Sequence, residues 1–246
     1  MTGAVFNQSR YNVRFEWGAE GVHRMAPLSN VIVIIDVLSF TTCVEIACSR
    51  KAKVFPYRFK DNSAGLFAKS VKALSAKKRG ETPSLSPGSL FTLEQKSRIV
   101  LPSPNGSTCT VIAKESNVCT IAGCLRNAFA VSNYIKSHYP NQVISVIACG
   151  EHWMNGTLRP AIEDLIGAGA ILSEFDQSKL SPEAKIAVSA FRNVEHNLKE
   201  TLRECSSGRE LTEKGFPEDA SIASELNISG VVPVFYDEAY INLLRY

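Results

Sequence analysis

Three acidic side chains, one at the end of an apolar stretch and two in the first turn of an expected helix, could hold a metal ion or act on a substrate. Asp36 follows residues 31–35, which are all apolar, so its carboxylate would be buried at a cost unless a partner compensates it. Glu163 and Asp164 are adjacent acids, and carboxylates are the hard oxygen ligands that Mg²⁺ takes. Capping of the next helix by Asp36, and dipole stabilisation by the other two, are the alternatives.

A second segment, residues 102–108, places small polar residues between an apolar stretch and an expected helix. It reads Pro-Ser-Pro-Asn-Gly-Ser-Thr, and Pro with Asn-Gly favours a tight turn. Free N–H groups at a helix start bind anions. The segment therefore indicates a phosphate or substrate site, although an ordinary turn with a capping residue explains it equally well. Its candidate residues are Ser103, Asn105, Gly106, Ser107 and Thr108.

Further candidates follow two other apolar stretches. Glu151 comes after residues 143–148 and could serve as a general base. Arg159, Arg126 and Asn127 stand near expected helix starts, where they could bind an anionic group. A solvated helix start explains the last two residues equally well.

The sequence lacks the residues that other known ways of binding or cleaving a phosphate require. A haloacid-dehalogenase-type phosphatase needs a second Asp two residues after the first, and Leu38 stands there. Neither Cys119 before Arg126 nor Cys149 before Arg159 has the spacing of a cysteine-dependent phosphatase. The 102–108 segment also lacks the Gly-Lys-Ser/Thr ending of a Walker loop.

The elements that would position these residues alternate between strands and helices, which predicts a doubly wound α/β sheet. In such sheets ligands bind beyond the carboxyl ends of the strands, which is where the candidates stand. The residue pattern predicts strands at 11–17, 31–35, 53–57, 98–101, 118–122, 143–148 and 231–236. It predicts helices at 41–50, 62–78, from 107, 125–138, 160–173 and 182–204.

Length and composition indicate one domain spanning residues 1–246. The net charge of +3 comes without any long basic block, so we expect no nucleic-acid partner. Seven scattered cysteines without a Cys-x-x-Cys pair indicate free thiols in a reducing compartment. No apolar run could act as a signal or span a bilayer. We therefore expect a cytoplasmic protein without a membrane partner.

Taken in order, these segments resemble the 2-phosphosulfolactate phosphatase family, an enzyme of coenzyme M biosynthesis. The resemblance depends on the sequence and spacing of six short motifs over most of the chain. They are residues 35–38 with Thr41-Thr42, 103–107, 123–128, 148–151, Glu163-Asp164 with 167–171, and 207–211.

The resemblance implies a three-layer α/β/α fold with a mostly parallel, mixed sheet. It also implies a Mg²⁺-dependent hydrolase that acts on a small acidic phosphomonoester, 2-phosphosulfolactate or a related phosphorylated hydroxy acid. Asp36, Glu163 and Asp164 would then lie near the metal, and residues 105–108 near the phosphate. Arg126 or Arg159 would hold the anionic end of the substrate, and Glu151 would be a base.

The chain departs from the family in its first motif, because Ser39 and Phe40 stand where the family commonly has Arg and Ala. Loss of that Arg puts the sulfonate-bearing substrate in question. The alternative is a non-catalytic module of the same fold that binds a phosphorylated ligand. The sequence leaves association into homo-oligomers open.

Overall fold

The computed structural model describes residues 3–243 and contains one nine-stranded sheet. Its strand order is β1-β7-β2-β6-β10-β11-β3-β5-β4, and a separate two-stranded ribbon is formed by β8 and β9. The strands are β1 (Val13–Trp17), β2 (Val31–Ile35), β3 (Lys53–Tyr57), β4 (Leu74–Ser75), β5 (Arg98–Pro102), β6 (Cys119–Gly123), β7 (Ile144–Ala148), β8 (Glu151–His152), β9 (Leu158–Arg159), β10 (Pro233–Tyr236) and β11 (Ala239–Asn242).

Strand β2 is buried on both faces, as its unbroken apolar sequence predicts. Val31, Val33 and Ile35 belong to the larger core, on the side of α6 to α8. Ile32 and Ile34 belong to the opposite core, with residues of α1 and α5. Because successive side chains of a strand point to opposite faces, β2 is the centre of a three-layer α/β/α fold.

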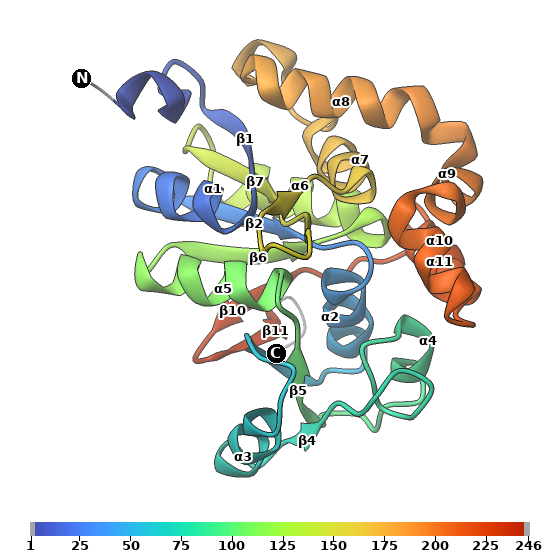
Figure 1. Ribbon diagram of the computed structural model, residues 1–246. Coiled ribbons are helices and arrows are strands. Elements are labelled where there is room, and N and C mark those ends of the chain that lie inside the picture. Colours follow the sequence, from blue (N-terminus) through green and yellow to red (C-terminus); the bar gives the residue numbers. More distant parts are fainter. Residues whose placement is uncertain (1–2, 244–246) are drawn as a thin grey trace.

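The helices form both outer layers and close one end of the sheet (Figure 1). Helices α8 to α11, orange to red, run along one side, and α3 and α4 lie at the end of the sheet far from β1. The helices are α1 (Gly18–Met25), α2 (Phe40–Ser49), α3 (Ser63–Ser70), α4 (Pro87–Leu90), α5 (Gly106–Glu115), α6 (Ala128–His138), α7 (Ile162–Leu172), α8 (Pro182–Val194), α9 (Leu198–Glu204), α10 (Ser206–Glu213) and α11 (Pro217–Ala223).

The sheet is mixed because a hairpin separates two parallel groups. Strands β1, β7, β2 and β6 pair in parallel, as do β3, β5 and β4. Hairpin β10–β11 pairs antiparallel with β6 on one side and with β3 on the other. The expected fold class is thus confirmed, although the residue pattern predicted β10 without its partner β11.

Two predicted helices are wrong in extent. The helix expected at 62–78 ends at Ser70, because Lys72 adopts a left-handed backbone with φ 50° and the chain then forms β4. The helix expected at 182–204 is interrupted by a 3₁₀ turn at Glu195–Asn197. His and Asn are weak helix formers, and the apolar face continues across the break. Within residues 3–243, no helix is both long and apolar enough to span a bilayer.

The contact between α7 and α8 leaves no room for a side chain at Gly169. A Cβ there would lie 2.1 Å from the carbonyl oxygen of Ala187, whereas a Cβ at Gly65, in helix α3, would meet nothing within 4 Å. We therefore expect Gly169→Ala to lower the free energy of unfolding by roughly 1–3 kcal/mol through overpacking. Gly65→Ala should leave it unchanged or raise it by up to about 1 kcal/mol. Urea unfolding of both variants checks this, and equal effects would contradict the close helix contact.

Candidate functional site

The carboxylate of Asp36 lies where the starts of two helices meet. Its Oδ1 accepts the backbone N–H of Phe40, at the start of α2, at 3.1 Å. Its Oδ2 accepts the N–H of Gly106, at the start of α5, at 2.9 Å and the Ser103 hydroxyl at 3.2 Å. Helix starts favour negative charge. In the turn after β5, the first free N–H group is that of Gly106, and it binds a carboxylate of the protein itself, that of Asp36.

Asp164 joins the same corner from helix α7. Its Oδ1 accepts the N–H of Val37 and its Oδ2 accepts the N–H of Gly150, each at 2.8 Å. These contacts tie the loops that follow β2 and β7 to the start of α7. Burial raises the pKa of Asp36 and raises that of Asp164 well above its usual range; the charge of Asp36 raises the latter further, and the backbone donors oppose both shifts.

Glu163 is buried beside Asp164 but does not line the cavity that Asp36 faces. Its carboxylate contacts the thiol of Cys205, whose pKa is raised to about 12, first by burial and then by the charge of Glu163. The three expected metal ligands are thus close together, but only Asp36 among them lines the cavity.

Glu151 is the second carboxylate that reaches the cavity. The amide nitrogen of Asn105 donates to its Oε2 at 2.8 Å, and the amide oxygen of Asn105 lies 3.0 Å from Nδ1 of His152. The pKa of Glu151 is raised to about 7, first by burial and then by the charge of Asp36, whereas Asn105 and Arg159 lower it. A carboxylate with such a pKa can exchange protons near neutrality.

The polar turn at 102–108 divides into two parts. Ser103 and Asn105 line the cavity together with Pro104. Gly106 is required for packing, because a Cβ there would lie 2.3 Å from Cδ1 of Phe40 and 2.8 Å from Asp36 Oδ2. Ser107 is fully buried and donates to the carbonyl oxygen of Leu101. Thr108 is partly buried and does not line the cavity.

The cavity has a volume of about 210 Å³, and its walls carry acids and bases. Asp36, Glu151 and Glu210 line it together with Lys60, Arg79 and Lys214. Lys214 forms an ion pair with Glu210, and Arg79 forms one with Asp219. These basic groups allow the cavity to accept an anionic ligand beside carboxylates.

Arg79 brings a guanidinium group beside Ser39, the residue that stands where the resemblance to the family leads us to expect Arg. Its Nη2 lies 3.5 Å from the hydroxyl of Ser39, although the two residues are far apart in sequence. The loss of the family Arg in the first motif is thus accompanied by another Arg that lines the same cavity.

The basic residues of the cavity were not among the residues that the sequence pattern indicated. Lys60 comes shortly after β3, so a closer reading of the loop beyond that strand could have found it. Arg79 is part of Lys77-Lys78-Arg79-Gly80, which resembles the basic end of a helix. Arg159, which the sequence did indicate, lies close to the cavity, where its Nη2 is 3.1 Å from the hydroxyl of Ser207.

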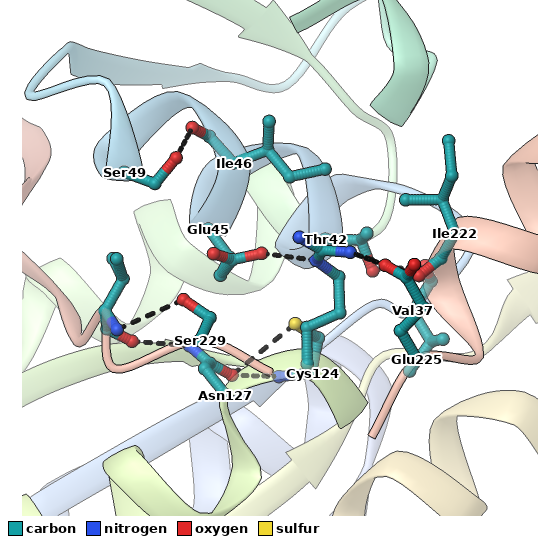
Figure 2. A network of polar contacts seen from close by, with 12 residues as sticks. Val37, Thr42, Glu45, Ile46, Ser49, Cys124, Asn127, Ile222, Glu225 and Ser229 are labelled. Carbon is teal, nitrogen blue, oxygen red and sulfur yellow. Dashed lines mark hydrogen bonds and ion pairs between the residues drawn. The ribbon is translucent and has the colours of Figure 1, made fainter. Parts of the chain in front are cut away.

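Arg126 and Asn127 do not line the cavity but belong to a buried network of polar contacts. Figure 2 labels Asn127 in this network, together with Glu45, Cys124 and Glu225. Arg126 Nε donates to Glu45 of α2 at 2.6 Å, and Nη1 forms an ion pair with Glu225. Asn127 accepts the N–H of Cys124. These contacts give both side chains a role within the fold rather than at the cavity. Glu45 is the single charged residue in α2. In the sequence, it was the signal that a buried cation would pair with this helix.

The carboxylates fit a metal site only in part. Within residues 3–243, no group of three His, Cys, Asp or Glu side chains is placed to hold a metal ion. Both oxygens of Asp164 and both oxygens of Asp36 already accept backbone N–H groups, but of the two residues only Asp36 lines the cavity. Asp36 and Glu151 are oxygen donors lining one cavity, and Mg²⁺ is often bound by one or two carboxylates, with waters and substrate phosphate completing its shell.

Replacement of Arg126 should reveal its structural role. Arg126→Met leaves Glu45 buried without a cation, so we expect the free energy of unfolding to fall by roughly 3–5 kcal/mol. Arg192→Met removes the exposed pair with Glu195 and should change it by less than about 1 kcal/mol. Urea unfolding compares them. Similar losses, or an unchanged Arg126→Met protein, would contradict the assignment.

Comparisons with known proteins agree with the resemblance read from the motifs. Residues 19–238 match the family model of 2-phosphosulpholactate phosphatase. A protein of Methanothermobacter thermautotrophicus named "2-phosphosulfolactate phosphatase" is 26% identical over 85% of this chain and 88% of its own length. One of Pseudothermotoga lettingae, named "Probable 2-phosphosulfolactate phosphatase", is 26% identical over 86% of this chain and 92% of its own. The chain belongs to the 2-phosphosulpholactate phosphatase family.

Proposed function

We propose that this protein is a Mg²⁺-dependent phosphatase of a small phosphorylated acid, 2-phosphosulfolactate or a related phosphorylated hydroxy acid. The observation that carries the proposal is one cavity in which two carboxylates, Asp36 and Glu151, face the bases Lys60, Arg79 and Lys214. Family membership and the names of the relatives support the same reaction.

The basic residues would bind the substrate. Arg79 and Lys60 offer charge-assisted hydrogen bonds to phosphate and carboxylate oxygens, and each lies near enough to Asp36 to interact with its charge. A guanidinium matches two oxygens of one anionic group at once. We therefore assign Arg79 to an anionic group of the substrate, beside Ser39.

Glu151 would accept the proton of the attacking water. The water oxygen would form a bond to phosphorus while the ester oxygen leaves with the electron pair and takes up a proton from solvent, and Glu151 later returns its own proton to solvent. Asn105 orients Glu151 for this role through its 2.8 Å hydrogen bond, and the neighbouring Asp36 keeps the carboxyl basic enough to act. Proton transfer of this kind contributes roughly 10²–10⁴-fold to a rate.

Asp36 is the cavity carboxylate that would hold the metal, beside Glu151, which stays free to act as the base. Mg²⁺, when bound, would neutralise charge on the phosphoryl group. The raised pKa of Glu151, which has the charge of Asp36 among its causes, supports the need for a cation between these carboxylates and an anionic substrate.

The alternative, a non-catalytic module that binds a phosphorylated ligand, is less favoured by the same cavity. Three of its lining residues are acidic, and carboxylates oppose the binding of an anion unless a cation or a proton offsets them. A site that only bound phosphate would gain nothing from them, whereas a hydrolase uses them.

Metal removal tests the proposed reaction. Purified protein with millimolar MgCl₂ should release inorganic phosphate from a phosphorylated 2-hydroxy acid, and excess EDTA should abolish the release because the substrate charge is no longer neutralised. Restored activity after Mg²⁺ is added back excludes damage by the chelator. Activity that persists in EDTA would remove the metal from the proposal, and absence of phosphate release under all conditions would favour the binding module.

The pH dependence tests the role of Glu151. Because the pKa of its carboxyl is raised to about 7 and the base acts ionised, kcat/KM should rise with pH and level off above that value. Glu151→Gln should lower kcat by roughly 10²-fold or more and remove this rise. Glu213→Gln, on the exposed side of α10, is the matched control and should keep the wild-type profile. A rise that survives in Glu151→Gln would assign the base elsewhere.

A further inference from the structure

A second and larger cavity opens beside the site. It has a volume of about 680 Å³ and lies between the start of α3 and the segment that follows β4. Figure 1 places both elements at the end of the sheet far from β1. Most of its lining residues lie between positions 60 and 65 and between positions 75 and 81, and Leu85 and Pro102 complete it.

The two cavities share part of their walls. Lys60, Arg79 and Leu85 line both of them. Arg79 is anchored between the two by its ion pair with Asp219 and its contact with Ser39. The larger cavity therefore continues the site and begins where the substrate's anionic group is expected.

The charged residues that line the larger cavity are mainly basic. Lys60, Lys77, Lys78 and Arg79 line it, against Asp61 and Glu81. The Asp61 carboxylate accepts the backbone N–H of Ser63 at 2.9 Å and also its hydroxyl. One of the two acids is thus engaged within its own turn, and the remaining charge favours an anionic occupant.

Size also distinguishes the cavities. The site cavity of about 210 Å³ accommodates a compact three-carbon acid with its phosphate. The joined space is in the range of pockets that enclose considerably larger ligands. A compact substrate would leave the Lys77 and Lys78 wall without a partner.

We propose that the larger cavity binds a second, distal anionic group, so that among the phosphorylated hydroxy acids of the proposed function the preferred substrates are elongated ones with a charged far end. The phosphate lies at Asp36 and Glu151, the chain passes Arg79 and Leu85, and the distal carboxylate or sulfonate lies at Lys77 and Lys78. This inference rests on the proposed function for the position of the phosphate.

The test compares phosphorylated 2-hydroxy acids of increasing length that end in a carboxylate, each with its terminal amide as a neutral match. For the wild-type protein, kcat/KM should be at least about fivefold higher for the longer carboxylates than for their amides, the size expected for one or two exposed charge contacts. The variant Lys77→Ala/Lys78→Ala should lose this preference while keeping its activity on the short ester. The control variant Lys69→Ala/Lys72→Ala replaces two exposed lysines outside the cavity. It loses the same amount of charge and should keep the preference for the carboxylate.

Equilibrium binding separates this inference from the proposed function. Titration calorimetry with the non-hydrolysable phosphonate analogues should show the same loss of carboxylate preference in Lys77→Ala/Lys78→Ala. Hydrolysis of short esters without any preference for the distal charge, or equal effects of the two double variants, would overturn the inference and leave the phosphatase standing. Binding that depends on Lys77 and Lys78 without any hydrolysis would overturn the phosphatase and leave the cavity assignment standing.

Discussion

The site depends on one carboxylate held by two helix starts. Asp36 ends the central strand β2, and its oxygens accept N–H groups from Phe40 of α2 and Gly106 of α5. Partial positive charge at a helix start stabilises an anion, so this contact fixes how both helices meet the sheet. Asp164 repeats the arrangement by binding the N–H groups of Val37 and Gly150. Together the two aspartates bring the ends of β2, β5 and β7 to one place.

Buried negative charge explains the chemistry of the cavity. Burial and the charge of Asp36 raise the pKa of Glu151 to about 7, and basic residues from three separate segments surround the acids: Lys60, Arg79 and Lys214. None of these bases lies on the parallel strands. Asp36 follows the central strand and Glu151 lies on the β8–β9 ribbon, whereas Lys60 and Arg79 lie on loops and Lys214 directly follows α10. Loop changes can therefore alter ligand choice without disturbing the central strands.

The sequence predicted the parts of this molecule that depend on local pattern. The unbroken apolar run of β2 predicted a central strand, and acids at strand ends predicted the location of Asp36 and Glu151. Arg79 could not be found, because its basic run resembles a helix end, whereas the left-handed turn at Lys72 and strand β4 separate it from α3. The pairing of Arg126 could not be predicted either, because its buried partner Glu45 lies 81 residues away and sequence spacing does not report such contacts.

Glu151 lies on the ribbon of β8 and β9 and is therefore not tied to the nine-stranded sheet, whereas Asp36 directly follows its central strand. The ribbon is a two-residue pair outside the nine-stranded sheet, and its tip exposes Trp153 and Met154 to solvent. Small isolated hairpins have little stability of their own, and local opening occurs where few apolar contacts resist it. Amide hydrogens of the ribbon should therefore exchange faster than those of β7. Fraying of this hairpin would move Glu151, whereas Asp36 at the end of the central strand would stay in place.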